Sequence, residues 1–129
     1  MTDPIADMLT RIRNAYAVGH KVTAMPFSGL KASVAQILVE SGYLVAAKKI
    51  KSGAHFQLEI TLKYVNTQPA ISHISRISMP GRRLYVKANH LPRTLSGYGT
   101  AIISTSQGVM SVKDARKCCL GGELICQVW

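Results

Sequence analysis

Residues 66–70 read NTQPA and decide how the chain is divided. The segment has little apolar content and contains a proline, a composition typical of turns and connections. Helical periodicity dominates before it, whereas short strands separated by glycine and proline dominate after it. The sequence therefore predicts an α+β protein of two small modules, residues 1–66 and 71–129, joined by a linker at residues 67–70.

The N-terminal module is expected to be a sheet covered by two helices. Asp3 and Pro4 are a typical helix start, because a carboxylate caps the first turn and proline needs no N–H there. This helix is expected to end near residue 19, and a second one, capped by Ser28 or Gly29, to end at Gly42. The apolar residues at helical spacing, expected in the core, are Ile5, Met8, Leu9 and Ile12, then Leu30, Val34, Ile37 and Leu38.

A hairpin is expected to complete this module, after a short extended stretch at residues 22–25. Residues 43–50 and 56–64 flank a turn at Ser52 and Gly53, and the second segment alternates strictly between apolar and polar residues. Such alternation indicates a strand with one buried face. The apolar positions expected on that face are Phe56, Leu58, Ile60, Leu62 and Tyr64.

The C-terminal module is expected to be mostly β with one short helix. Glycine and proline separate the segments that read as strands. The helix is expected after Ser111, where SVKD is a variant of the capping box. The expected strands are residues 71–79, 82–87, 100–105 and 123–129.

Charge and composition limit the classes of partner. The 129 residues carry a formal net charge of +10, and 47% of them are hydrophobic, which is enough for packed cores. Such positive charge favours a polyanion, so nucleic acid is the leading partner class and an anionic membrane surface the second. Charged residues interrupt the most apolar region, so no membrane partner is expected. The N-terminal stretch lacks the apolar core of a signal peptide, which predicts a cytoplasmic protein.

No cofactor, metal or catalytic site is expected. The three cysteines, Cys118, Cys119 and Cys126, have no C-x-x-C spacing, and the four histidines lie far apart in the sequence. A serine hydrolase is the enzymatic alternative, but the chain has no G-x-S-x-G motif, and it also lacks a P-loop and a dinucleotide fingerprint. The sequence therefore predicts reduced thiols and a protein that is not an enzyme.

The segment PGRRLYV, residues 80–86, carries one set of candidate RNA-binding residues. Arg82 and Arg83 can pair with phosphate, and Tyr85 can stack on an unpaired base. Arginines on a solvated edge strand are the structural alternative.

The N-terminal helices carry a second set of candidates. Arg11, Arg13 and Lys31 could contact phosphates, although helical cations of this kind are often simply solvated. Thr2 is included as well, but helix capping is the first role expected for Thr2 and its neighbour Asp3.

The segment STSQGVM, residues 104–110, is unusual because it places hydroxyl groups where a basic protein could carry lysines. Gly108 permits a tight turn, and the side chains of Ser104 and Ser106 are expected on one side with Thr105 on the other. Hydroxyls both donate and accept hydrogen bonds, so they can meet a ribose 2′-OH, a phosphate oxygen or a base edge. The alternative is that serine and threonine merely suit the end of a strand.

Four separated blocks resemble, in order and spacing, the bacterial form of the small-subunit ribosomal protein eight family. They are DPIADMLTRIRNA at 3–15, PGRRLYV at 80–86, STSQGVMS at 104–111 and GGELICQVW at 121–129. The resemblance spans essentially the whole chain. It implies a non-enzymatic protein of two α/β modules that binds small-subunit ribosomal RNA directly and supports early assembly of the central part of the subunit.

The resemblance also implies partners and site residues. The partners would be small-subunit ribosomal RNA, neighbouring small-subunit ribosomal proteins and, as in some members, the protein's own messenger RNA. The N-terminal module would touch a neighbouring RNA helix, and a stand-alone translational regulator that binds RNA is the alternative function. The implied principal RNA contact consists of Ser104, Thr105, Ser106, Gln107 and Gly108, with Tyr85 and Glu123 supporting or contacting this surface.

The chain departs from the family pattern at four positions. Gln107 stands where lysine is usual, and Cys119 stands where glycine would suit the end of the short helix. Tyr98 and Thr100 replace residues that are more often aliphatic.

Overall fold

Two units of structure make up the chain, residues 3–71 (unit 1) and residues 72–129 (unit 2). The computed structural model describes residues 3–91 and 99–129, so Thr2 and Tyr98 lie outside the described residues. Helices and antiparallel sheets occur together, and this confirms the predicted α+β class.

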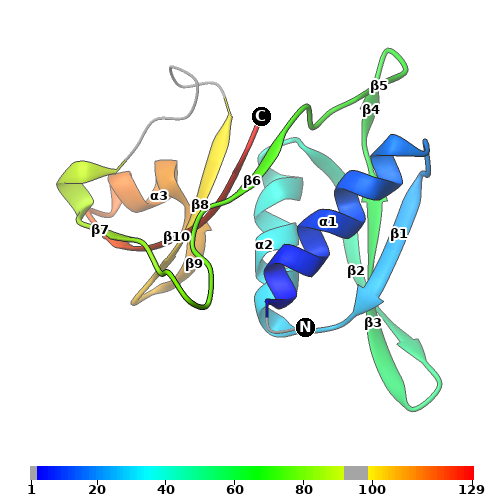
Figure 1. Cartoon of the computed structure of the whole chain (residues 1–129), viewed down its shortest axis with the longest axis horizontal. Helices are drawn as coiled ribbons and strands as arrows, with labels where there is room; N and C mark the ends of the chain where they lie inside the picture. Colours follow the sequence, from blue (N-terminus) through cyan, green and yellow to red (C-terminus); the bar gives the residue numbers. More distant parts are fainter. Residues whose placement is uncertain (1–2, 92–98) are drawn as a thin grey trace. The chain divides into compact units, whose positions relative to one another are not determined.

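Unit 1 is a three-stranded antiparallel sheet with two helices. Its strands β1 (Val22–Pro26), β2 (Leu44–Ser52) and β3 (His55–Leu62) lie in the order β1-β3-β2. Helices α1 (Pro4–Ala17) and α2 (Gly29–Glu40) lie side by side and pack against this sheet (Figure 1). The expected helix-covered sheet is therefore present.

Capping side chains set the starts of both helices. Asp3 Oδ1 accepts a hydrogen bond from Ala6 N at 3.2 Å, and Ser28 Oγ accepts one from Lys31 N at 3.2 Å. Each bond satisfies a backbone N–H that the first helical turn leaves without a partner. Of the two residues expected as the cap of α2, Ser28 is the one observed. Gly42, with φ +86°, follows the end of the helix as expected.

Two residues expected in the core of unit 1 are exposed instead. Leu30 is 45% exposed, because α2 turns Lys31 toward the protein interior in its place, and Lys31 is only 5% exposed. Phe56 is 47% exposed, because it lies beside the turn of the β2–β3 hairpin, where the hairpin extends past the helices (Figure 1). The other predicted positions with a buried side chain are Ile5, Met8, Leu9, Ile12, Val34, Ile37, Leu38, Leu58, Ile60 and Leu62.

Residues 66–70 contain a tight turn within unit 1. Strand β4 (Tyr64–Val65) pairs with β5 (Gln68–Pro69), and the two residues between them, Asn66 and Thr67, have φ of 51° and 65°. Positive φ at both central residues is the geometry of a two-residue hairpin turn. A small hairpin thus occupies most of the segment expected as a linker, and the boundaries of separately acting modules stay a prediction.

Unit 2 is built around strand β10 (Gly122–Val128). One edge of β10 pairs in succession with β6 (Ile74–Arg76) and β7 (Tyr85–Val86). Its other edge pairs with β8 (Thr100–Thr105), which pairs in turn with β9 (Gly108–Ser111). Helix α3 (Val112–Lys117) packs on β8, and Ser111 Oγ caps it by accepting from Asp114 N at 3.2 Å.

A core of unit 2 lies between this sheet and α3, and its buried members are Ala101, Ile103, Val112, Ala115 and Leu124.

The expected strands 71–79 and 82–87 are longer than the observed strands β6 and β7. These two strands share one edge of β10, and a turn divides them. Met79 and Arg82 exchange backbone hydrogen bonds of 3.0 and 2.9 Å around Pro80 and Gly81. A 3₁₀ turn, Ala88–His90, follows β7.

All three cysteines are free, as the sequence predicts. Burial raises the pKa of the Cys126 thiol to about 12, although the nearby Arg76 guanidinium acts in the opposite direction. Cys118 and Cys119 are exposed after α3, and Cys119 has φ +55°, so the cysteine adopts the left-handed conformation that would suit a glycine at this position. Within residues 3–91 and 99–129, no group of three histidine, cysteine or acidic side chains could hold a metal ion. None of the described helices is long and apolar enough to cross a membrane.

Candidate nucleic-acid interface

The hydroxyl-rich segment forms the tip of the β8–β9 hairpin. Thr105 pairs with Gly108, so Ser106 and Gln107 are the two residues of the turn. Thr105 Oγ1 donates a hydrogen bond to the Gly108 carbonyl at 2.8 Å and accepts one from Gln107 N at 3.1 Å. Gly108 has φ +113°, a conformation that other residues rarely adopt. The Thr105 hydroxyl therefore holds the shape of the tip.

The remaining polar groups of the tip face solvent. Ser106, Gln107 and Gly108 are exposed, whereas Ser104 and Thr105 are half-buried. Within the described part of the chain, the Ser106 hydroxyl makes no hydrogen bond. It can therefore donate and accept toward a bound molecule without breaking a contact in the protein.

Strand register places three candidate residues in one row across the sheet. Glu123 of β10 lies opposite Tyr85 of β7 on one edge and opposite Ser104 of β8 on the other. Directly opposed residues of antiparallel strands point to the same face of a sheet. The next residues along, Leu124 and Ile103, are buried in the core, so the row lies on the opposite face. Residues that are far apart in sequence are thus brought together next to the hydroxyl tip.

Two consecutive glycines allow this row to form. A Cβ atom on Gly122 would lie 2.0 Å from the Ser104 carbonyl oxygen, and one on Gly121 would lie 2.4 Å from the Val86 carbonyl oxygen. Both obstacles are backbone atoms, so no side chain could move aside to make room. From the sequence, these glycines are expected only as breaks between strands, although paired glycines at a strand start also indicate close backbone approach.

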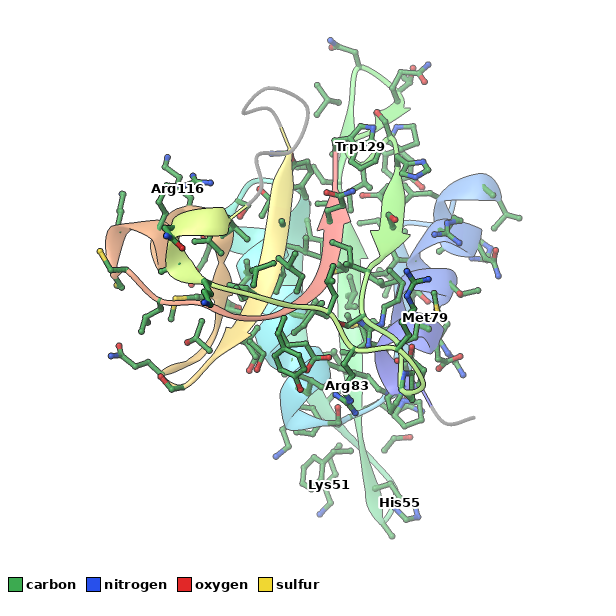
Figure 2. The ribbon with its side chains drawn as sticks, turned by 60° about the vertical axis from the view of Figure 1, so that its left-hand side comes forward. Lys51, His55, Met79, Arg83, Arg116 and Trp129 are labelled. Atoms are coloured by element: carbon green, nitrogen blue, oxygen red, sulfur yellow. The ribbon has the colours of Figure 1, made fainter. Side chains whose placement is uncertain are left out.

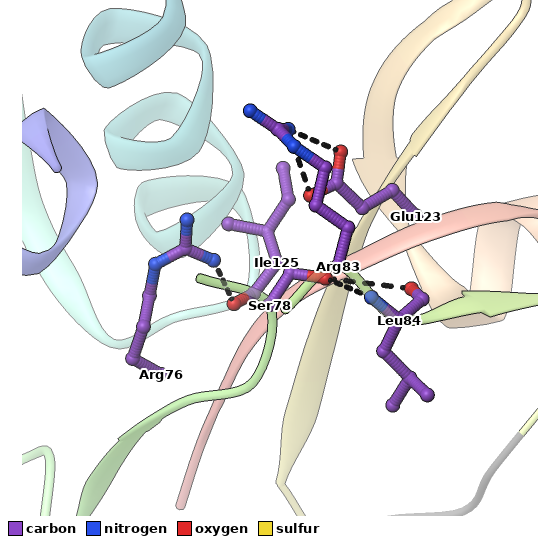
Figure 3. A network of polar contacts seen from close by, with 6 residues as sticks. All are labelled: Arg76, Ser78, Arg83, Leu84, Glu123 and Ile125. Atoms are coloured by element: carbon purple, nitrogen blue, oxygen red, sulfur yellow. Dashed lines mark hydrogen bonds and ion pairs between the residues drawn. The ribbon is translucent and has the colours of Figure 1, made fainter. Parts of the chain in front are cut away.

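Arg83 and Glu123 form an ion pair at the edge of the row. Arg83 Nη1 lies 3.2 Å from both carboxylate oxygens of Glu123, whose side chain is only 15% exposed (Figure 3). A guanidinium carries five N–H donors, so others remain for a phosphate. Arg82, in the bridge to Met79, is exposed.

Ser78 and Arg76 make hydrogen bonds to the backbone near Arg83, and neither residue is among the candidates expected from the sequence. Ser78 is fully buried, and its Oγ accepts from Leu84 N at 2.7 Å (Figure 3). Arg76 Nη1 donates to the Ile125 carbonyl at 2.6 Å. Nothing in the local sequence distinguishes these roles, because both depend on partners from other segments.

Two of the candidate residues in unit 1, Arg11 and Lys31, already make contacts within the protein. Arg11 Nε forms an ion pair with Asp7 at 3.0 Å, and its Nη1 donates to the Ala24 carbonyl at 3.3 Å. The Lys31 ammonium donates to the Pro26 carbonyl at 2.9 Å. Arg13 is exposed on α1. Of the candidates in unit 1, Arg11 and Arg13 thus have exposed side chains, and Lys31 does not.

A family model described as ribosomal protein S8 matches residues 3–129. The chain belongs to the ribosomal protein S8 family. Members of this family are structural proteins of the ribosome, so the chain is a small-subunit ribosomal protein that binds small-subunit ribosomal RNA, and it is not an enzyme.

Individual relatives in the S8 family match over nearly their full length. A protein of Caldanaerobacter subterraneus named small ribosomal subunit protein uS8 is 53% identical over 100% of this chain and 98% of its own length. Proteins of the same name from Clostridium novyi and Sorangium cellulosum are each 50% identical over 100% of this chain, and over 98% and 99% of their own lengths.

Proposed function

We propose that the β8–β9 tip and the row Tyr85, Glu123 and Ser104 form the principal contact of this protein with small-subunit ribosomal RNA. The observation that carries the proposal is an exposed Ser106 hydroxyl with no hydrogen bond in the described part of the protein, at a tip that Thr105 holds in shape. A preformed tip loses little conformational freedom on binding, so more of its hydrogen-bond energy contributes to affinity.

The chemistry of the tip favours an irregular part of an RNA minor groove. The minor groove of RNA is wide and shallow and displays 2′-hydroxyls and base edges, which serine and glutamine can both donate to and accept from. Tyr85 is 65% exposed beside the tip and can stack on a base that has left its pair. The net charge of +10 attracts RNA from a distance, and the neutral tip distinguishes one RNA shape from another at contact.

Binding of this kind would serve early assembly of the central part of the subunit in the cytoplasm. Arg82, Arg83 and Arg13 contribute contacts to phosphates, and neighbouring small-subunit ribosomal proteins pack around the complex. The surface reads RNA shape, so a segment of the protein's own messenger RNA with the same irregular groove would bind to it as well. Thr105 and Gly108 act by holding the tip, and Lys31 has no part in this surface.

Ser106→Ala tests the proposal, because it removes a donor and an acceptor without changing charge. We expect specific binding to a cognate ribosomal RNA fragment to weaken by about 1 to 3 kcal/mol, since a buried RNA partner loses its hydrogen bond. Non-specific binding should stay unchanged, because no phosphate contact is lost. The measurement is a titration of cognate and scrambled RNA hairpins, with folding checked by circular dichroism.

Ser33→Ala on α2 is the matched control, because Ser33 is an exposed serine outside the proposed surface. It should leave both affinities unchanged. If Ser106→Ala lowers both affinities equally, or neither, the hydroxyl tip is an ordinary turn and the proposal is wrong.

A further inference from the structure

Two phenylalanines and a lysine form a cluster in unit 1 that the proposed rRNA contact does not use. Phe56 and Lys49 are exposed, and Phe27 is half-buried. Phe27 follows β1 and Phe56 lies on β3, and the backbone N–H of Phe27 donates to the Phe56 carbonyl at 3.1 Å. The Lys49 ammonium lies 4.6 Å from the centroid of the Phe27 ring and 4.4 Å from that of the Phe56 ring. One cation is thus held over two aromatic rings.

The same rings line an open cavity of about 490 Å³. This volume lies within the range of small-ligand sites, about 300 to 1,000 Å³. The two rings provide apolar surface, and two other lining residues, His55 and Gln57, provide hydrogen-bonding groups. The complete lining is Pro26, Phe27, Ala54, His55, Phe56 and Gln57.

Three lysines, Lys31, Lys49 and Lys51, neighbour residues that line this cavity. Lys51 pairs with Phe56 in the strand register, and Figure 2 shows Lys51 and His55 at the far end of the β2–β3 hairpin. The Lys31 ammonium donates to the carbonyl of the lining residue Pro26 and has no acidic partner in the described part of the chain. Glu59 is the acidic residue of these two strands, and it lies opposite Lys48 in the register. The occupant should therefore be an anion.

We infer that this cluster binds one unpaired nucleotide of RNA, with its base stacked on Phe56 and its phosphate near Lys49. A nucleotide combines the two features that the cluster requires, a planar ring for the aromatic surface and a negative charge for the ammonium groups. Bases inside a duplex are already stacked on each other, so a single-stranded or extruded base is the form that can enter. The site lies in unit 1 and is independent of the hydroxyl tip in unit 2.

The test uses the full chain and an end-labelled single-stranded RNA of about ten nucleotides, with affinity measured by fluorescence anisotropy. Phe56→Ala should weaken binding about tenfold, because the base loses the aromatic ring on which it stacks. Val45→Ala is the matched control, since Val45 is a 55% exposed apolar residue of β2 outside the cavity. It should leave the affinity unchanged.

A second pair of variants separates the cluster from the general electrostatic field. Lys49→Gln and Lys48→Gln remove the same charge from adjacent residues of β2, but only Lys49 lies over the rings. We expect Lys49→Gln to weaken binding several times more than Lys48→Gln. Equal effects of the two lysine variants, or equal effects of Phe56→Ala and Val45→Ala, would show that the cluster has no specific role.

A photocrosslink identifies the occupant directly. RNA containing 5-iodouridine should crosslink to Phe56 or Phe27, as located by peptide mapping, because the reaction requires a base in contact with the ring. If an acidic peptide competes more strongly than RNA, the partner is a protein and the inference fails. Ser106→Ala should leave single-stranded RNA affinity unchanged, so failure here is distinguishable from failure of the proposed rRNA contact.

Discussion

The tips of the β2–β3 and β8–β9 hairpins differ in their chemistry. The β2–β3 tip carries Lys51 and His55 on either side of its turn, whereas the β8–β9 tip presents Ser106 and Gln107, which have no charge. Charge acts over about 8 Å at physiological salt, but hydroxyl and amide groups act only at contact and only in the right direction. In the proposed function, attraction of RNA and recognition of its shape therefore belong to different parts of one small protein.

The largest expected effect comes from the glycines beneath the neutral tip. Gly122→Ala would place a Cβ 2.0 Å from the Ser104 carbonyl oxygen, so β8 and β10 must separate, and unit 2 should lose about 3 kcal/mol of stability. Gly53→Ala in the charged tip meets nothing within 4 Å, and its φ of +62° should cost only about 1 to 2 kcal/mol.

Urea unfolding measures this difference in each unit. The protein has one tryptophan, Trp129, whose ring stacks on His73 in unit 2, so its fluorescence reports on that unit. Circular dichroism follows the Gly53→Ala variant in unit 1. Similar losses from both substitutions would mean that the close approach at Gly122 does not exist in solution.

Substitutions that add a charge to one tip or remove one from the other should change the electrostatic part of the RNA affinity. Gln107→Lys adds a charge to the neutral tip, so it should raise the affinity for any RNA and steepen the dependence on salt by about one unit in the logarithmic slope. Lys51→Gln should flatten that slope by about one unit if Lys51 meets a phosphate. Salt titrations of both variants with cognate and scrambled hairpins provide the measurement.

The result for Gln107→Lys also tests whether the lysine that is usual at this position in the S8 family makes a specific RNA contact. A gain for the cognate hairpin that exceeds the gain for the scrambled one means that a lysine here restores a specific contact. If the salt slope does not change, residue 107 does not meet a phosphate.

The smallest expected effect concerns the pair of Arg83 and Glu123. Arg83 is 55% exposed at its side chain, so the pair should contribute less than about 1 kcal/mol to the stability of unit 2. A double-mutant cycle of Arg83→Ala and Glu123→Gln, followed by Trp129 fluorescence in urea, isolates this energy. A coupling energy of zero would indicate that the two side chains do not interact in solution.

Sequence reasoning succeeded where neighbouring residues determine the structure. The caps at Asp3 and Ser111 depend on residues within one turn of the chain, and both are where the sequence predicts them. The cap of α2, Ser28, is one of the two that the sequence allows. Strand β8 also has the predicted bounds, because its buried apolar residues are followed directly by a tight turn.

The failures concern partners that are distant in sequence. Periodicity gave Leu30 and Lys31 opposite roles from those observed, because it could not include the Pro26 carbonyl that accepts from the lysine. The contact of Arg83 with Glu123 spans 40 residues, and β6 and β7 are shorter than expected because both pair with the same edge of β10. The hydroxyl segment could be identified from the sequence. Only the hydrogen bonds of the structure distinguish Thr105, which holds the shape of the tip, from Ser106, whose hydroxyl faces solvent.

The place of β10 in unit 2 has a consequence for how the protein is made. Each of β6, β7 and β8 pairs with β10, although all three precede it in the chain. A ribosome synthesising this protein must therefore add residues 122–128 before the sheet of unit 2 can form. The sheet of unit 1 needs nothing beyond Leu62, so it can fold while the remainder is still being translated. Long-range pairing also slows folding, so the surface that carries the hydroxyl tip is expected to be the last part to mature.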